Sequence, residues 1–217
     1  SYMALGIVMD IPWYLIACIH SLEASLNFKT HLHNGDPLSN RTVHVPAGRP
    51  KIGTPPFTWV TSAADALGEK INGIWATDII GIRNGDIDAI LFALESYNGF
   101  GYKKYHPEIK TPYLWSKTNH YSKGKYVEDG KYNANAISSQ IGAAAILKAL
   151  EQRGEIKFDL INDDLKIPLV NSRSEMKTII KLQIFMNSFE GDNLEEDGKV
   201  GPKTKIRFKE IFGFDMP

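Results

Sequence analysis

Glu23 and Asp36 are two carboxylates whose positions could support acid–base chemistry. Glu23 ends an apolar helical pattern, where burial would raise its pKa and keep it protonated near neutral pH. Glycoside hydrolysis requires such an acid, and a second carboxylate that attacks or stabilises the anomeric carbon or activates water. From its position alone, a solvated glutamate at a helix end is the simpler interpretation of Glu23.

Asp36 lies within Asn34-Gly35-Asp36-Pro37, a sequence typical of a tight turn. It is therefore open to two interpretations, a catalytic carboxylate and a turn former. His31 and His33 alternate as residues on one face of a strand do, and with Asp36 they could share a metal ion. Because no third strong ligand is assignable, we expect sugar contacts or hairpin packing for these histidines, and no metal.

Residues 101–133 form a long irregular segment rich in tyrosine and lysine. Its aromatic content favours order, and loops of this length in compact domains are commonly functional. We expect four aromatic side chains to line a cleft for sugar rings, although each could equally fill a core: Tyr97, Tyr102, Tyr113 and Trp115. A similar mixture can bind single-stranded nucleic acid, but 25 basic residues balance 25 acidic ones and no nucleic-acid-binding motif is present.

The elements that would position these residues are mostly helices. Asp10-Ile11-Pro12 resembles a helix start, and helical spacing continues to Glu23. Residues 28–56 are rich in glycine and proline and predict a hairpin and loop region. Further helices are predicted from Thr61, at about 71–80, 86–97 and 135–152, and, beyond a polar linker at 153–164, at 175–187 and 203–212.

The composition is that of an ordinary globular protein. The 217 residues are 43% hydrophobic and 23% charged, enough for one large domain or two small ones. The longest apolar stretches, 11–19 and 141–150, fall short of the ~20 residues of a membrane span. No signal peptide is visible in the first ten residues. Cys18 is the single cysteine, so no disulfide forms within the chain, and we expect it to be a buried hydrophobe.

Most of residues 10–150 resemble lysozyme-like enzymes in several short motifs, and the order of these motifs is informative. The stretch from Glu23 through Asp36 to Thr42 resembles phage-type lysozymes, in which a helix-terminal Glu precedes a hairpin bearing an Asp and, six residues later, a Thr. The Glu-to-Asp gap is longer here than in the short members of that family. The residues before Glu23 resemble the catalytic helix of lytic transglycosylases, although Ala24 stands where those enzymes have Ser.

Other short sequence segments support the same resemblance. Tyr97-Asn98-Gly99 is similar to the segment that lines the cleft in the transglycosylase and goose-type branch, which implies that Asn98 contacts substrate. Four segments resemble the corresponding sequences of a wall-lytic protein family of phages and bacteria: His31-Leu-His-Asn-Gly-Asp-Pro-Leu38, Val45-Pro-Ala-Gly-Arg-Pro50, Pro55-Pro-Phe-Thr-Trp59 and Pro112-Tyr-Leu-Trp115.

The C-terminal residues resemble a peptidoglycan-binding three-helix module. Leu182-Gln183 is followed by Asp197-Gly198, Gly201-Pro202 and Thr204, which meets the family pattern at every one of these positions. The two glycines permit a tight turn, and Pro202 suits a helix start. An EF-hand does not fit residues 192–199, because Leu194 stands where an oxygen ligand is required.

We therefore expect a mainly α (α+β) fold with a lysozyme-like catalytic domain over residues 1–157, a short β-hairpin region near 28–50, and a peptidoglycan-binding domain over 158–217. The resemblance implies an endolysin-like N-acetylmuramidase that cleaves the β-1,4 bond between N-acetylmuramic acid and N-acetylglucosamine. Glu23 would be the general acid, Asp36 the second carboxylate, and Thr42 would position water or Asp36. We expect a monomer that acts on the bacterial cell wall, in the periplasm or outside the cell, without a cofactor.

Two alternatives stay open. A lytic transglycosylase would keep the fold but use Glu23 alone, first as acid and then as base, and leave an anhydro sugar. A non-catalytic wall-binding protein would keep the fold without the chemistry. A chitinase or chitosanase is a weaker third alternative, because the C-terminal module argues against it.

Overall fold

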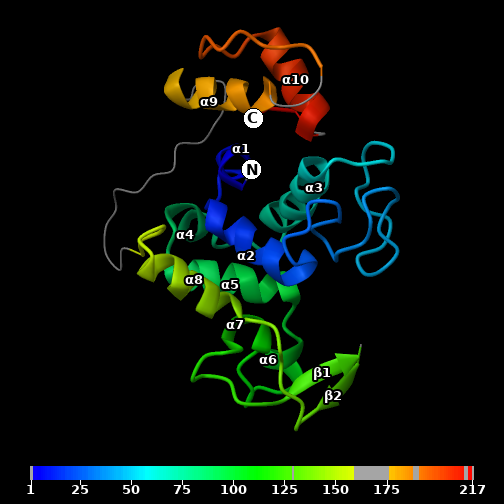
Figure 1. Ribbon diagram of the computed structural model, residues 1–217, viewed down its shortest axis with the longest axis vertical. Coiled ribbons are helices and arrows are strands. Elements are labelled where there is room, and N and C mark those ends of the chain that lie inside the picture. The colour runs from blue at the N-terminus through cyan, green and yellow to red at the C-terminus, as the bar shows by residue number, and fades with distance from the viewer. Residues whose placement is uncertain (1, 129, 159–175, 188–190, 213–214, 217) are drawn as a thin grey trace.

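Helices stacked along one long axis are the main regular structure of the chain in the computed structural model (Figure 1). The structure describes residues 2–128, 130–158, 176–187, 191–212 and 215–216. Within them, ten helices and one two-stranded antiparallel hairpin are present, and the chain is 48% helical. In chain order the elements are α1 (Tyr2–Met9), α2 (Trp13–Ala24), α3 (Trp59–Asn72), α4 (Ile79–Asn84), α5 (Ile87–Asn98), α6 (Gly101–Tyr105), α7 (Pro112–Trp115), β1 (Lys125–Glu128), β2 (Lys131–Asn133), α8 (Ala143–Gln152), α9 (Met176–Asn187) and α10 (Pro202–Phe212).

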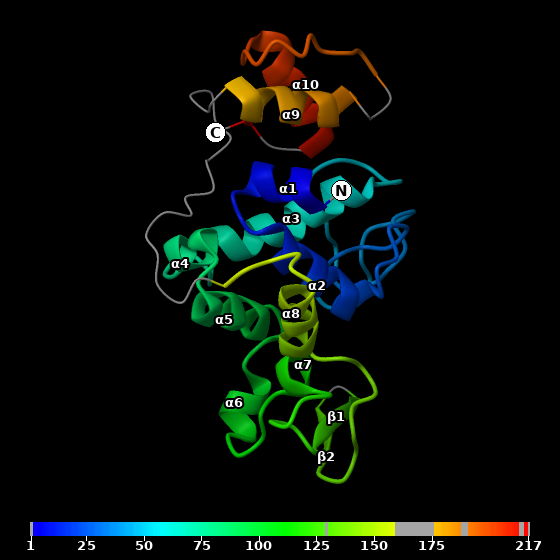
Figure 2. The same cartoon turned by 60° about the vertical axis from the view of Figure 1, so that its left-hand side comes forward.

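Helix α2 is the centre of the body, and α1, α5 and α8 pack against it (Figure 2). Leu15, Ile16 and Ile19 are fully buried, as expected for a helix that is apolar on most of its circumference. No single helix among the described residues has the length and apolar character needed to cross a membrane; α1 and α2 meet that test only as a pair, bent by 118°.

His20 is buried on α2 within an aromatic cluster. The Trp59 indole Nε1–H donates to His20 Nε2 (3.1 Å), and the Tyr2 hydroxyl lies 2.8 Å from Nδ1. Because Nε2 accepts, Nδ1 carries the proton and donates to Tyr2. Burial lowers the pKa of His20. The ring therefore joins α1, α2 and α3 as a neutral imidazole.

The prediction of a β-hairpin near residues 28–50 is wrong. This segment contains no strand and only one isolated bridge, between Thr30 and Pro37. Turns and side-chain hydrogen bonds organise it instead, as its glycine and proline content allows. The two-stranded sheet lies at β1 and β2, inside the segment predicted to be irregular. Tyr126 pairs with Tyr132 there, and the register shifts between Tyr126 and Glu128.

Most predicted helices are confirmed, but several boundaries are not. The helix predicted over 71–80 is wrong, because α3 ends at Asn72 and α4 begins only at Ile79. The helix predicted over 135–152 begins later, with Gly142 as the N-cap of α8. Asp10 is not a helix cap; it occupies a turn at φ 53° and forms an ion pair with Arg83 (2.7 Å). Helix α1 was not predicted.

Helices α9 and α10 form the C-terminal part and lie beside α1 and α3 (Figures 1 and 2). The Thr61 hydroxyl donates to the carbonyl of Ile211 (3.1 Å), which ties α3 to α10. The third helix of the predicted module is not among the described residues, and residues 159–164, half of the predicted linker, lie outside them. The boundary at 157/158 stays a prediction.

Gly142 sets how closely α8 approaches α7, and its replacement tests this packing. A Cβ there would lie 2.4 Å from the Leu114 carbonyl oxygen and 2.7 Å from the Ser116 nitrogen. Gly142→Ala should therefore lower the free energy of unfolding by roughly 1–3 kcal/mol, because backbone must move.

Denaturant unfolding measures the effect, with Gly101→Ala as the matched control, since a Cβ at Gly101 meets nothing within 4 Å. Equal stability of the two variants would contradict the packing described for α7 and α8.

Candidate functional site

Glu23 lies on the last turn of α2, at the point where the chain reverses. Ser25 and Leu26 both adopt positive φ (50° and 59°), and the Ser25 amide donates to the carbonyl of His20, which ends the helix. Gly35, at φ 79°, lies against this end, and a Cβ on it would be 3.0 Å from the Glu23 carbonyl oxygen. The turn at Gly35 therefore requires glycine both for its conformation and for its close approach to Glu23.

Glu23 faces a cavity of about 320 Å³, called here the Glu23 cavity. Its walls come from α2, α3, the end of α5 and the 31–50 loop. The lining residues are Glu23, His33, Val45, Pro46, Ala66, Glu69, Lys70, Tyr97 and Asn98. Residues far apart in sequence thus surround one carboxyl group.

Burial raises the pKa of Glu23 to about 7, against the opposing effects of a hydrogen bond from Tyr113 and the charge of Lys70. The Tyr113 hydroxyl donates to Glu23 Oε1 (2.9 Å). Burial also raises the pKa of Tyr113, which stays a neutral donor. A carboxyl group with a pKa near 7 is protonated in a large fraction of molecules at neutral pH and can act as a general acid.

Lys70 approaches Glu23 from α3. Its ammonium group donates to the carbonyls of Ser96 and Tyr97 (both 3.3 Å) at the end of α5 and lies 4.9 Å from the centroid of the Tyr97 ring. Burial lowers the pKa of Lys70, while Glu69 and Glu23 oppose this. Lys70 therefore caps α5 and places a positive charge near the candidate acid.

Asp36 is buried but does not line the Glu23 cavity. Its Oδ2 accepts hydrogen bonds from the amides of Val43 and His44 (2.8 and 3.0 Å) and from the Asn34 side chain (3.1 Å), and its Oδ1 lies 2.6 Å from His44 Nδ1. Burial alone would raise the pKa of Asp36, but the hydrogen bonds from His44 and Val43 outweigh it and lower the pKa to about 2. These contacts are those of a turn former.

Thr42 is also part of the loop framework. Its hydroxyl donates to the carbonyl of Pro46 (2.5 Å) and accepts from the amide of Arg49 (2.9 Å). Thr42 is buried and, like Asp36, is absent from the lining of the Glu23 cavity. Both residues shape the loop that supplies Val45 and Pro46 to the cavity.

The two histidines have different surroundings. His31 is fully buried between the Ser62 hydroxyl and the carbonyl of Asn40, both at 2.8 Å. His33 lines the cavity and contacts Asp65 Oδ2 (2.9 Å). Among the described residues, no group of three or more His, Cys, Asp or Glu is arranged to hold a metal ion.

The predicted aromatic residues divide between two cavities. Tyr97 lines the Glu23 cavity, and its hydroxyl donates to the carbonyl of Leu32 (3.1 Å). Tyr102 and Tyr113 line a neighbouring cavity of about 560 Å³, together with Tyr105, Tyr126 and Gln140. Asn98 lines both cavities. Trp115 lines neither; it is half-buried and meets His120 edge to face.

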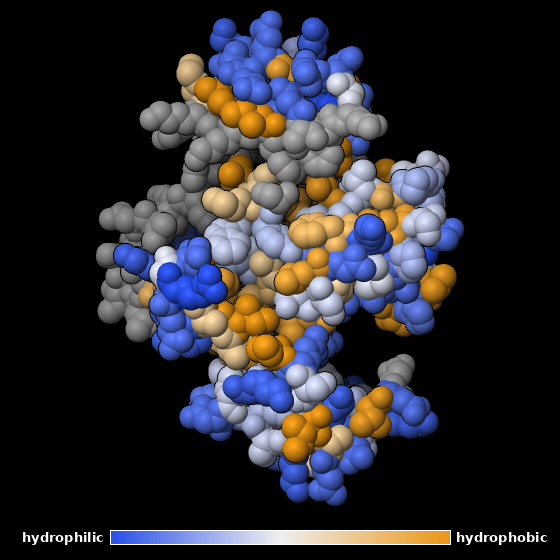
Figure 3. Space-filling view, in the orientation of Figure 1, coloured by the Kyte–Doolittle hydropathy of each residue, from blue (hydrophilic) through white to orange (hydrophobic). Residues whose placement is uncertain are grey.

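The two cavities adjoin at Asn98, where α5 ends. In the space-filling view, a notch separates the helical body from the lower part that carries β1 and β2 (Figure 3). The Gln140 side chain donates to the carbonyl of Leu22 (2.6 Å) and so links the lower part to the end of α2.

Sequence reasoning missed Glu69, Lys70, Gln140 and the ion pairs around Arg49. The helical spacing of Ala66, Glu69 and Lys70 predicts that they share a face of α3. Nothing in the sequence indicates that this face lies opposite Glu23.

A search of protein-family models, curated proteins and solved structures finds no match to this chain.

Removal of the Tyr113 hydroxyl tests the electrostatics of the site. This hydroxyl stabilises the ionised form of Glu23, so Tyr113→Phe should raise the pKa of Glu23 above its value of about 7. Titration of the Glu23 carboxyl carbon by NMR measures this shift. Tyr102→Phe is the control, because the Tyr102 hydroxyl accepts from the Tyr126 amide and does not contact Glu23. An unchanged or lower pKa in Tyr113→Phe would contradict the assigned hydrogen bond.

Proposed function

We propose that this chain is a lysozyme-like glycoside hydrolase that cuts the glycan strands of peptidoglycan, as an endolysin-like N-acetylmuramidase does, with Glu23 as general acid. The observation that carries the proposal is the protonated character of Glu23: burial gives it a pKa of about 7 inside a cavity that adjoins a second, tyrosine-lined cavity. Protonation of the glycosidic oxygen is the step for which such a carboxyl group is suited.

The surroundings of Glu23 suit a sugar polymer. Tyr97, Asn98 and Val45 line the Glu23 cavity, and the Val45 side chain is 86% exposed. Tyr102 and Tyr113 line the adjoining cavity. Sugar rings present both C–H faces and hydroxyls, and flat aromatic rings with amide groups complement them. Peptidoglycan, rather than another polysaccharide, is proposed because of the C-terminal motif.

The C-terminal motif residues contact one another. The Gln183 side chain donates to Asp197 Oδ1 and to the carbonyl of Lys199 (both 3.0 Å) and accepts from the Gly198 amide (2.8 Å). The Thr204 hydroxyl donates to the carbonyl of Lys199 (3.3 Å). Leu182, Met186 and Phe208 are among the buried apolar residues of α9 and α10. These bonds give the side chains of Gln183, Asp197 and Thr204 a structural role in the motif. The match to the motif supports a wall-binding role.

One observation favours a second candidate, a lytic transglycosylase. Both Asp36 oxygens are engaged within the loop, so Asp36 is poorly suited to serve as the second carboxylate. A transglycosylase needs only Glu23, because a hydroxyl of the sugar itself replaces water. Mass spectrometry of the released muropeptides separates the two functions, since the anhydro product lacks one water.

Glu23→Gln tests the catalytic proposal. The amide cannot donate a proton to the leaving oxygen, so release of soluble fragments from purified sacculi should fall by about 10²–10⁴-fold. Glu155→Gln is the matched control and should retain full activity, because Glu155 is exposed and distant in sequence from Glu23. Release by neither wild type nor variant, with binding retained, would indicate a non-catalytic wall-binding protein.

Gly198→Ala tests wall binding in the full chain. Gly198 has φ 72°, and a Cβ there would lie 2.3 Å from Met176 Cγ, so the variant should distort the Gln183 contacts and weaken co-sedimentation with sacculi at least several-fold. Gly154→Ala is matched in backbone conformation (φ 73°) but has nothing within 4 Å. Both changes are made in the Glu23→Gln background to prevent digestion. Equal binding by the two variants would argue against this surface as the wall-binding site.

A further inference from the structure

Glu69 is a second carboxylate on the wall of the Glu23 cavity. It lies on α3 one turn after Ala66 and next to Lys70, and all three line the cavity. The Glu69 side chain is 54% exposed, so solvent reaches it. Glu23 and Glu69 are thus the two acidic residues that line this cavity within the described part of the chain.

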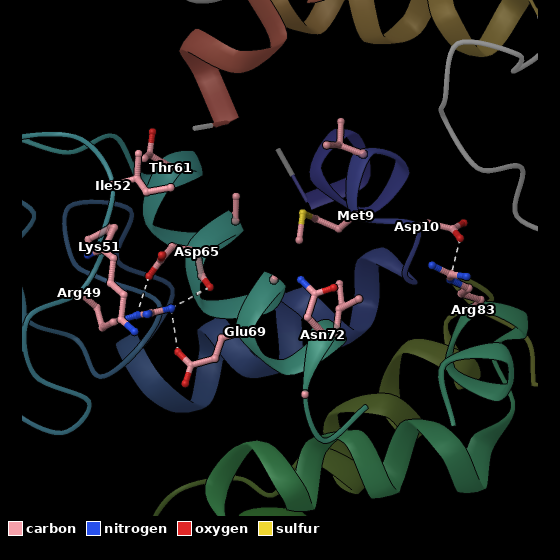
Figure 4. Close-up of a pocket in the computed structure, with 16 residues that line it drawn as sticks. Met9, Asp10, Arg49, Lys51, Ile52, Thr61, Asp65, Glu69, Asn72 and Arg83 are labelled. Atoms are coloured by element: carbon pink, nitrogen blue, oxygen red, sulfur yellow. Dashed lines mark hydrogen bonds and ion pairs between the residues drawn. The ribbon is translucent and has the colours of Figure 1, made fainter. Parts of the chain in front are cut away.

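Arg49 fixes the position of Glu69. Its Nη2 lies 2.7 Å from Glu69 Oε2, and its Nε lies 2.8 Å from Asp65 Oδ2, so the guanidinium group bridges the two carboxylates. Figure 4 shows these three side chains from a second pocket, of about 720 Å³, which they also line. His33 contacts the same oxygen of Asp65 (2.9 Å). The Arg49 side chain is largely buried, and it therefore offers a positioned rather than a mobile cation. Arg49 contacts Glu69 through Oε2, and no hydrogen bond to Oε1 is present among the described residues.

Asp36 lacks these properties. Its side chain is 8% exposed, both of its oxygens accept hydrogen bonds within the loop, and it does not line the cavity. A carboxylate held in this way is a poor base, because proton uptake would break several hydrogen bonds. The second carboxylate required by hydrolysis has to be found elsewhere.

We propose that Glu69 is the general base that activates water in glycan hydrolysis; this proposal rests on the proposed function of Glu23. The Glu23 carboxyl group gives its proton to the glycosidic oxygen as the bond from that oxygen to the anomeric carbon breaks. A water oxygen bonds to the anomeric carbon from the opposite face and loses a proton to Glu69. One water is consumed, the anomeric configuration inverts, and proton exchange with solvent restores both side chains.

This assignment distinguishes hydrolysis from transglycosylation. In a transglycosylase the attacking hydroxyl belongs to the substrate, and Glu23 itself takes up the proton, so Glu69 would have no chemical role. In a hydrolase, loss of a general base costs about 10²–10⁴-fold in kcat. A residue that only shaped the cavity would instead affect KM or stability.

Glu69→Gln in the full chain tests the proposal. The change is nearly isosteric at a half-exposed position, so the melting temperature should match that of the control Glu155→Gln. We expect kcat on a soluble peptidoglycan oligosaccharide to fall at least 100-fold with little change in KM. Azide, which needs no general base, should restore turnover and give the glycosyl azide of inverted configuration by NMR.

Three results would overturn the assignment of Glu69 while leaving Glu23 as the acid. The first is that Glu69→Gln retains more than about a tenth of wild-type kcat when Glu23→Gln is inactive. The second is that the wild-type product contains anhydro sugars, and the third is that azide does not restore turnover to an inactive Glu69→Gln. Full activity of Glu23→Gln would instead overturn the proposed function itself, so the two failures are distinguishable.

Discussion

The burial of one carboxyl group, that of Glu23, is the constraint on which the site depends. A charge there would lose most of its hydration, so the group holds its proton up to a pKa of about 7. Because this value lies above the usual 4.5, the folded chain binds the proton more tightly than the unfolded chain does, and stability declines as pH rises from 4.5 to 7. The apolar core around α2 outweighs this cost and keeps the acid in place.

Glu23 and Asp36 show how surroundings assign different roles to similar side chains. Burial dominates at Glu23, where the Tyr113 hydroxyl is the one hydrogen-bond donor to the carboxyl among described residues. At Asp36, backbone amides and His44 outweigh burial and lower the pKa to about 2. A carboxyl group that stays neutral can give a proton, whereas one that stays charged can organise a loop. The loop that Asp36 holds supplies Val45 and Pro46 to the Glu23 cavity.

Helix α3 connects the parts of the molecule. One face carries Glu69 and Lys70 into the cavity, Asp65 contacts Arg49 and His33 of the loop, and Thr61 bonds to the end of α10. If α9 and α10 bind the wall as we propose, their attachment to the helix that forms the cavity wall would keep a bound polymer close to Glu23. Such tethering would raise the local concentration of the polymer without any change in the chemistry.

The sequence by itself determined the local features: the apolar helix that carries Glu23 on its last turn, the helix near residues 86–97, the turn at Gly35 and the glutamine and glycine pattern near Gln183. Each depends on periodicity or on the conformational demands of single residues, which are properties of neighbours in the chain. The tertiary structure alone decided that Glu69 and Tyr113 surround Glu23, that Asp36 serves the loop, and that the sheet forms at β1 and β2. These outcomes depend on contacts between segments that are distant in sequence. Burial and hydrogen bonding at those contacts determine the pKa of each carboxyl group and which of its oxygens have hydrogen-bond partners.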